Sequence, residues 1–96
     1  MEFTWDETKR EKVIAEHKVD FAEIQDVFDD HYAVYIEDFK HSTDEEIRFN
    51  IIGQSINYGL VFAVFTYDAS DDIRLITARK AENWMVKEYD ENRKRL

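Results

Sequence analysis

Residues 46–79, EIRFNIIGQSINYGLVFAVFTYDASDDIRLITAR, decide the fold of this 96-residue chain. Three runs within them are rich in β-branched and aromatic residues, which favour strands: 46–54, 60–67 and 73–79. The polar segments between the runs, 57–59 and 68–72, are short enough for hairpin connections. The stretch therefore predicts an antiparallel meander of three strands.

The residues before the meander predict two helices flanked by short strands. Phe3 and Trp5 alternate with polar residues, which indicates a first strand, and helical spacing then runs from Asp6 to about Lys18. Asp20 followed by Glu23 resembles a capping box, which predicts a second helix that starts at Phe21. The apolar face of that helix would be Phe21, Ile24, Val27 and Phe28, and we expect Trp5 and Phe28 to be buried.

Two further elements complete the expected architecture. Residues 33–37 read as a fourth long strand, and Ala81, Met85 and Tyr89 follow helical spacing. The latter pattern predicts a C-terminal helix that covers one face of the sheet. The expected fold class is α+β, a two-layer domain with an antiparallel sheet, two N-terminal helices and a C-terminal helix. At this length residues 1–96 should form a single domain.

The composition excludes several classes of protein. There is no cysteine, so disulfides and thiolate metal sites are excluded. Hydrophobic residues make up 44% of the chain, which argues against wholesale disorder. The longest apolar stretch, 60–65, is too short to span a bilayer, and the acidic N-terminus does not resemble a secretory signal. We therefore expect a cytoplasmic protein with no membrane partner.

The net charge of −9 is distributed unevenly along the chain. Residues 1–72 hold 18 acidic and 6 basic residues, whereas residues 73–96 hold 7 basic and 4 acidic ones. An acidic N-terminal segment followed by a basic C-terminal segment allows a local anion site within an acidic protein. The alternative is that the bases at 93–95 only complement the C-terminal dipole of the last helix.

Several short motifs occur in order from residue 3 to about residue 89. They are Phe3-Thr4-Trp5-Asp6 with Lys9 (WDxxK), Glu16-His17, Val19 to Glu23, Val27 to Asp30, His41 with Glu46 and Arg48, Ile52-Gly53, Val64-Phe65-Thr66, and RLITARKA at 74–81. In this combination the sequence resembles the BrnT toxins. The resemblance implies a RelE-like fold, a metal-independent endoribonuclease that inhibits translation in bacteria, and neutralisation by a BrnA-like ribbon-helix-helix antitoxin.

The sequence departs from that family at two places. Lys18 stands where relatives usually have a glycine after the histidine at the helix end, so the turn there should differ locally. Residues 82–86 are acidic to apolar, whereas the family commonly carries a basic stretch in the last helix. Fewer positive charges near the implied RNA site raise the question of whether nuclease activity is weakened.

Metal-free RNA cleavage by the neighbouring 2′-hydroxyl needs a base, an acid and fixed positive charge for the transition state. Arginine suits only the last role, because its pKa is too high for proton exchange while its planar fork matches phosphate oxygens. A simple hairpin register places Arg48 near Thr66, and Thr66 near Arg74. Arg79 has the opposite parity to Arg74 in an ideal strand, but it lies at the strand end, where a bulge or the start of a helix can re-aim its side chain.

The candidate catalytic residues are therefore Arg48, Arg74, Arg79 and His41, the last because histidine exchanges protons near neutral pH. Lys80 and Tyr89 are candidate substrate contacts, although the place of Tyr89 on an apolar helix face also fits core packing. For the arginines the alternative is an exposed strand charge paired with an acid, and for His41 it is a solvated loop residue.

No metal or cofactor is expected, since the three histidines are too far apart in sequence to form a local ligand motif. Two functions from different classes stay open. The first is an RNA-cleaving toxin with RNA and an antitoxin as partners. The second is a non-catalytic interaction domain on the same scaffold, whose acidic surface binds a basic protein. The sequence also leaves a homo-oligomer open.

Overall fold

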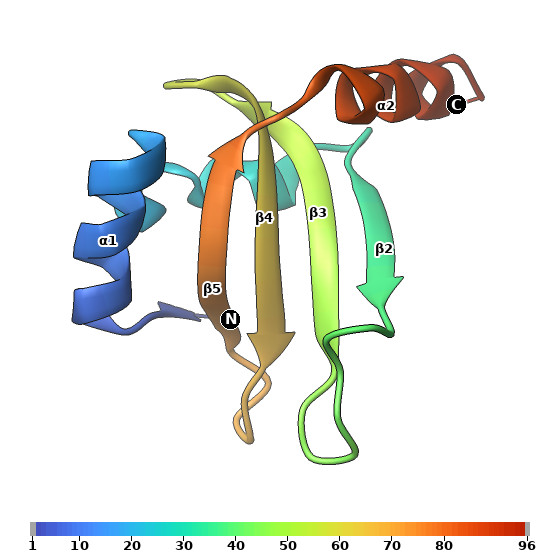
Figure 1. Ribbon diagram of the computed structural model, residues 1–96. Helices are drawn as coiled ribbons and strands as arrows, with labels where there is room; N and C mark the ends of the chain where they lie inside the picture. The colour runs from blue at the N-terminus through green and yellow to red at the C-terminus, as the bar shows by residue number, and fades with distance from the viewer. Residues whose placement is uncertain (1, 96) are drawn as a thin grey trace.

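The computed structural model describes residues 2–95, which form one five-stranded sheet flanked by helices (Figure 1). The elements in chain order are β1 (Phe3–Thr4), α1 (Glu7–His17), the 3₁₀ segments η1 (Phe21–Glu23) and η2 (Gln25–Asp29), β2 (Val34–Asp38), β3 (Arg48–Ser55), β4 (Gly59–Tyr67), β5 (Ile73–Lys80) and α2 (Asn83–Arg95). The predicted α+β class and the positions of the four long strands and the last helix are confirmed.

The strand order across the sheet is β1-β5-β4-β3-β2. The β2–β3, β3–β4 and β4–β5 pairs are antiparallel, which confirms the predicted meander. The predicted register of Thr66 beside Arg74 is also confirmed. β1 pairs with β5 in parallel, so the sheet is mixed, and the prediction of a purely antiparallel sheet was wrong at this edge.

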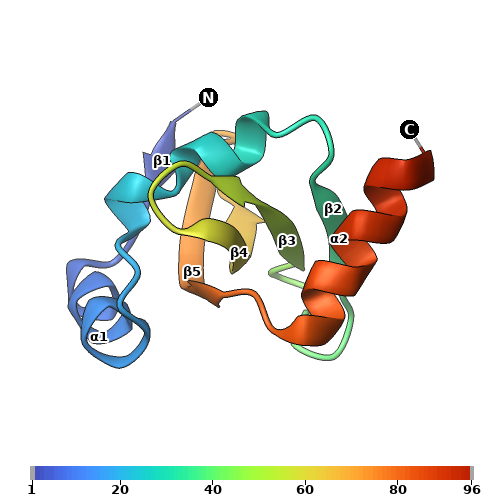
Figure 2. The ribbon, with the colours of Figure 1, turned by 90° about the horizontal axis from the view of Figure 1, so that it is seen from above.

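One face of the sheet is covered by the N-terminal third of the chain. Figure 2 shows η1 and η2 on this side and α1 beside β5, at the end of the sheet where β1 and β5 lie. The main core lies between them and the sheet, and its fully or nearly fully buried members are Val13, Val19, Phe21, Ile24, Val27, Ile51, Val61, Ala63, Phe65, Ile73, Leu75 and Ala78. Burial of these side chains supplies most of the hydrophobic stabilisation of the fold.

The opposite face is covered only at one end, where α2 crosses it (Figures 1 and 2). Met85 and Tyr89 of α2 are buried there with Ile52, and Phe62 packs against this smaller cluster. The Tyr89 hydroxyl donates to Asp30 Oδ2 at 2.8 Å, and the same oxygen accepts from the backbone N–H of Gln54 at 2.8 Å. Asp30 therefore joins α2 to β3. The remainder of this face, toward the other end of β3, β4 and β5, is left open.

The predicted second N-terminal helix is absent as an α-helix, and this prediction was wrong. Ile24 adopts φ −122° and ψ 12°, which ends η1 and starts η2, and the Asp20 side chain accepts from the N–H of Ala22. In a 3₁₀ helix the side chains at i and i+3 lie in line, so the spacing of Phe21, Ile24 and Val27 suits this geometry. These three side chains are buried as predicted.

Two aromatic residues that we expected to be buried are only half-buried. Trp5 and Phe28 both pack against the main core from its rim. The Phe28 ring lies 5.0 Å from the Phe65 ring and 5.2 Å from the Phe3 ring. Phe28 therefore closes the core where β1 meets η2, and part of its surface remains in contact with solvent.

The first prediction concerns Gly53, which lets η2 approach the sheet. A Cβ at this position would lie 2.6 Å from Val27 Cγ1 and 3.0 Å from the Val27 carbonyl oxygen. We expect Gly53→Ala to destabilise the protein by about 1–3 kcal/mol through overpacking. Thermal unfolding measures this loss of stability. The loss caused by Gly53→Ala should be smaller when the substitution is made in a Val27→Ala background. Equal melting temperatures for Gly53→Ala and the parent would contradict it.

The second prediction concerns Lys18, which ends α1 in the left-handed region at φ 60°. Its backbone N–H donates to the Ile14 carbonyl at 3.0 Å, a geometry that glycine adopts without steric strain. Lys18→Gly should stabilise the protein by about 0.5–1 kcal/mol, seen as a higher melting temperature. The matched control is Lys12→Gly in the exposed interior of α1, which should lower stability by about 1 kcal/mol. A lower melting temperature for both variants would refute the argument.

Candidate functional site

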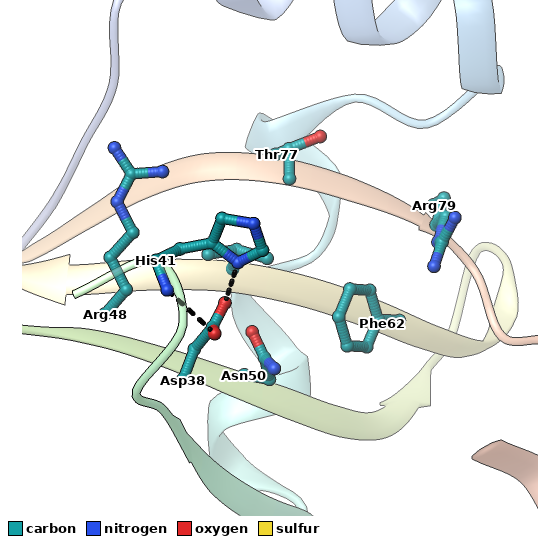
Figure 3. A pocket seen from close by; sticks show the side chains of 8 residues that line it. Asp38, His41, Arg48, Asn50, Phe62, Thr77 and Arg79 are labelled. Carbon is teal, nitrogen blue, oxygen red and sulfur yellow. Dashed lines mark hydrogen bonds and ion pairs between the residues drawn. The ribbon is translucent and has the colours of Figure 1, made fainter.

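A pocket of about 400 Å³ opens on the part of the sheet that α2 leaves uncovered (Figure 3). Its walls come from β2, β3, β4, β5 and the loop after β2. The lining residues are Asp38, His41, Arg48, Asn50, Phe62, Val64, Thr77 and Arg79. In Figure 3, Arg48 and Arg79 stand at opposite ends of the pocket, with His41 and Asn50 between them.

A β-bulge in β5 places Arg79 in this pocket. Val64 pairs with Thr77 and Phe65 pairs with Leu75, so Ile76 has no partner in β4. The extra residue reverses the alternation of side chains along the strand. Arg74 and Arg79 therefore point to the same face of the sheet, and the bulge is one of the two ways in which we expected the side chain of Arg79 to be re-aimed.

The Arg79 side chain is held in place at one end of the pocket. Its guanidinium carbon lies 5.2 Å from the centroid of the Phe62 ring, a cation–π arrangement. Its Nη1 lies 3.2 Å from Glu82 Oε1, and its buried Nε has no hydrogen-bond partner among residues 2–95. The guanidinium thus has a fixed position and unused donor capacity.

Arg48 is held at the other end of the pocket and is connected to the loop that carries His41. The Arg48 Nε donates to Glu46 Oε1 at 2.9 Å. The backbone N–H of Arg48 donates to Ser42 Oγ at 2.9 Å, and the Ser42 hydroxyl donates to the Asp38 carbonyl at 2.6 Å. These bonds fix the loop of residues 39–47 against the start of β3.

Asp38 orients the imidazole of His41. Asp38 Oδ1 accepts from the backbone N–H of His41 at 3.2 Å, and Oδ2 lies 2.9 Å from the ring Nδ1 (Figure 3). Burial acts to raise the pKa of Asp38, but the hydrogen bonds from His41 and the charges of His41 and Arg48 outweigh it, and the pKa lies below its usual value. An ionised carboxylate only accepts hydrogen bonds, so Asp38 acts as the acceptor toward Nδ1, and Nε2 is the ring nitrogen that Asp38 does not engage.

A second pocket, of about 230 Å³, adjoins the first. Its lining residues are Asp6, Lys9, Glu46, Arg48, Arg74, Leu75 and Ile76. Arg48 lines both pockets, so the two are neighbours on the same side of the sheet. Asp6 caps the N-terminus of α1 by accepting from the N–H of Lys9 at 3.0 Å.

The structure brings together most of the residues that the sequence analysis selected. Arg48, Arg79 and His41 line the first pocket, and Arg74 lines the second. Thr66, which we expected on the same face as the arginines, is buried, and its hydroxyl donates to the Ile47 carbonyl at 2.7 Å.

Lys80 and Tyr89 line neither pocket. Lys80 is exposed at the end of β5, opposite Val61 of the main core. Tyr89 is buried under α2, where burial together with the hydrogen bond to Asp30 raises the pKa of its hydroxyl to about 12. Its position fits the core-packing alternative.

Four lining residues of the first pocket were not predicted from the sequence, namely Asp38, Phe62, Val64 and Thr77. The three-residue spacing of Asp38 and His41 at the end of a predicted strand was a usable signal for the carboxylate–imidazole pair. Phe62 and Thr77 depend on the register and on the bulge, which no local pattern reveals. Lys9 was noted only as part of the WDxxK motif, and its place in the second pocket was not foreseen.

Neither helix within residues 2–95 has the length and apolar character that a membrane span requires. In the same part of the chain, no three or more histidine, aspartate or glutamate side chains gather closely enough to hold a metal ion.

Comparisons with known proteins agree with the geometry of the fold. Residues 5–84 match the family described as the ribonuclease toxin BrnT of a type II toxin–antitoxin system. The crystal structure of the Brucella abortus ribonuclease toxin BrnT superposes with a TM-score of 0.68 at 27% sequence identity, covering 86% of this chain and 99% of that one. No curated protein sequence gives a match. Because the family match extends over most of its length, the chain belongs to the BrnT family of ribonuclease toxins.

Proposed function

We propose that this protein is a metal-independent endoribonuclease whose active site is the first pocket. The observation that carries the proposal is that two guanidinium groups, those of Arg48 and Arg79, and the carboxylate-oriented imidazole of His41 line one open pocket. Two arginines supply fixed positive charge and the imidazole supplies proton exchange, which are the requirements for cleavage by the adjacent 2′-hydroxyl.

In the proposed reaction the 2′-oxygen bonds to phosphorus while the bond from phosphorus to the 5′-oxygen breaks. The Nε2 atom of His41 takes the proton of the 2′-hydroxyl, and Asp38 stabilises the resulting imidazolium. Arg48 and Arg79 stabilise the additional negative charge on the phosphoryl oxygens. Water protonates the departing 5′-oxygen, and the resulting hydroxide takes the proton back from the His41 imidazolium. The products are a 2′,3′-cyclic phosphate and a 5′-hydroxyl.

The proposal extends to the biological setting. We place the protein in the bacterial cytoplasm, where RNA cleavage would inhibit translation and a BrnA-like antitoxin would neutralise it. We also assign a RelE-like fold and a single functional domain over residues 1–96. The supports are the family match and the acidic charge of residues 1–72, which favours a basic partner segment.

A specific observation favours the second candidate, a non-catalytic interaction domain. Each arginine of the first pocket already has a carboxylate partner, with Arg48 bonded to Glu46 and Arg79 paired with Glu82. Such pairs also occur where an arginine has only a structural role. Induced expression without antitoxin separates the two candidates, because growth arrest requires an active toxin.

The third prediction tests the arginines. Arg48→Ala and Arg79→Ala should each lower the rate of RNA cleavage about 10²–10³-fold, because each removes a preorganised charge contact. Arg48→Lys and Arg79→Lys should fall between parent and alanine variant, since lysine keeps the charge but loses the planar fork. Cleavage of labelled RNA by purified toxin, free of antitoxin, measures the effect.

The control for these variants is Arg93→Ala, which removes an exposed charge of α2 that lines neither pocket. Its cleavage rate should equal that of the parent. If Arg48→Ala and Arg79→Ala fold normally and cleave as fast as Arg93→Ala, the arginines have no part in the reaction. If the folded parent cleaves no RNA, the interaction-domain function is favoured.

The fourth prediction concerns Asp38 and His41. His41→Ala should lower cleavage about 10²–10⁴-fold, the usual contribution of general acid–base catalysis, and Asp38→Asn should lower it by a smaller factor. Because the folded-state pKa of Asp38 is depressed, its contribution to stability is present above the unfolded pKa and is lost as the pH falls through the folded value. The difference in melting temperature between parent and Asp38→Asn should therefore disappear on acidification. A difference that persists below pH of about 2 would contradict this assignment.

A further inference from the structure

The second pocket holds more positive than negative charge, with Lys9, Arg48 and Arg74 against Asp6 and Glu46. Glu46 is bonded to Arg48, and one carboxylate oxygen of Asp6 caps α1. By contrast, the side chains of Lys9 and Arg74 have no ion pair or hydrogen bond with any other residue in the described range 2–95. The pocket thus offers an ammonium and a guanidinium group to a ligand from outside.

These two cations lie beside the proposed active site. Arg74 pairs with Thr66 across the β4–β5 ladder, and the Phe49–Phe65 pair places Arg48 next to Thr66 on the other side. Arg48 and Arg74 are therefore two strands apart, about 10 Å between backbones. Lys9 reaches the pocket from the first turns of α1, beyond β5. A polyanion bound at Arg48 and continuing toward α1 would meet Arg74 and Lys9 in turn.

We propose that Lys9 and Arg74 bind a phosphate of the RNA that flanks the one being cleaved, on the same strand. This inference rests on the proposed function of the first pocket. A phosphodiester fits the pocket because both free groups are cationic donors, which match the acceptor oxygens of a phosphate. The other walls of the pocket, Leu75 and Ile76, provide no donors or acceptors from their side chains to read a base edge.

Such a subsite would position the RNA without reading its sequence, because phosphate contacts fix register and base contacts specify. It also gives a role to the lysine of the WDxxK motif. Asp6 starts α1, and Lys9 follows three residues later, so the helix cap sets the point from which the lysine extends. The subsite predicts that the protein prefers RNA that extends past the cleaved linkage over a minimal dinucleotide.

The experiment replaces single phosphates by uncharged methylphosphonates, one at a time, on both sides of the cleavage site of a short RNA. For the parent, a methylphosphonate at one flanking position should lower kcat/KM about tenfold. The double variant Lys9→Ala/Arg74→Ala should cleave the all-phosphate RNA about tenfold more slowly and should be insensitive to the methylphosphonate at that position. Lys9→Arg should retain the sensitivity of the parent.

Binding of the same RNAs with a 2′-deoxy sugar at the cleavage site provides a readout that does not depend on catalysis. The slope of log Kd against log salt should fall by about one for each cation removed. The matched control is Lys12→Ala, an exposed lysine of α1 that lines neither pocket and should leave the methylphosphonate pattern unchanged.

The two arms separate failure of the inference from failure of the proposed function. If the double variant keeps the sensitivity of the parent to every methylphosphonate, or behaves as Lys12→Ala does, the subsite is wrong although the ribonuclease function stands. If the parent binds RNA but does not cleave it, the proposed function is wrong. The salt dependence of RNA binding then still tests whether Lys9 and Arg74 form a phosphate subsite. Absence of RNA binding by the folded parent overturns both.

Discussion

In the β4–β5 ladder Ile76 has no partner, because it lies between the Val64–Thr77 and Phe65–Leu75 pairs. Without it, strict alternation would send Arg79 to the face that carries Ile73 and Leu75, which is the main core. A guanidinium cannot enter that core unpaired without a large desolvation penalty. The bulge thus satisfies two demands at once: β5 supplies apolar side chains to the core along its whole length, and both of its arginines remain on the open face.

The uneven coverage of the sheet has a similar double role. Phe62 belongs to the cluster under α2 and is also a wall of the first pocket, where the Arg79 guanidinium lies over its ring. The docking of α2, held by the Tyr89–Asp30 hydrogen bond, therefore supports one end of the site. A longer covering element would close the pocket, and loss of α2 would leave Phe62 and the Arg79 side chain without their support.

The sequence was sufficient to predict the elements whose signal is local. The β-branched and aromatic residues of 60–67 and the helical spacing of Ala81, Met85 and Tyr89 correspond directly to β4 and α2. The segment from Phe21 was misassigned because Phe21, Ile24 and Val27 are three apart, a spacing shared by α- and 3₁₀-helices, and the break at Ile24 has no local signal in the sequence. Of the residues in the candidate site, the arginines could be predicted from the sequence, because the chemistry of their side chains suits a phosphate. Their grouping into two pockets, and the addition of Asp38 and Lys9, depend on strand register, on the bulge and on loop closure, which are tertiary properties.

The carboxylates that hold Arg48 and Arg79 give the site an electrostatic screen. Glu46 and Glu82 neutralise the guanidinium groups at a distance, and the chain as a whole carries a charge of −9. Within the Debye length the acidic surface repels a polyanion, and beyond that distance salt screens the repulsion. On the proposed function, an RNA strand would gain a favourable interaction only where it displaces or shares these counter-ions at close range, so that geometric fit, rather than gross charge, would select what the site binds.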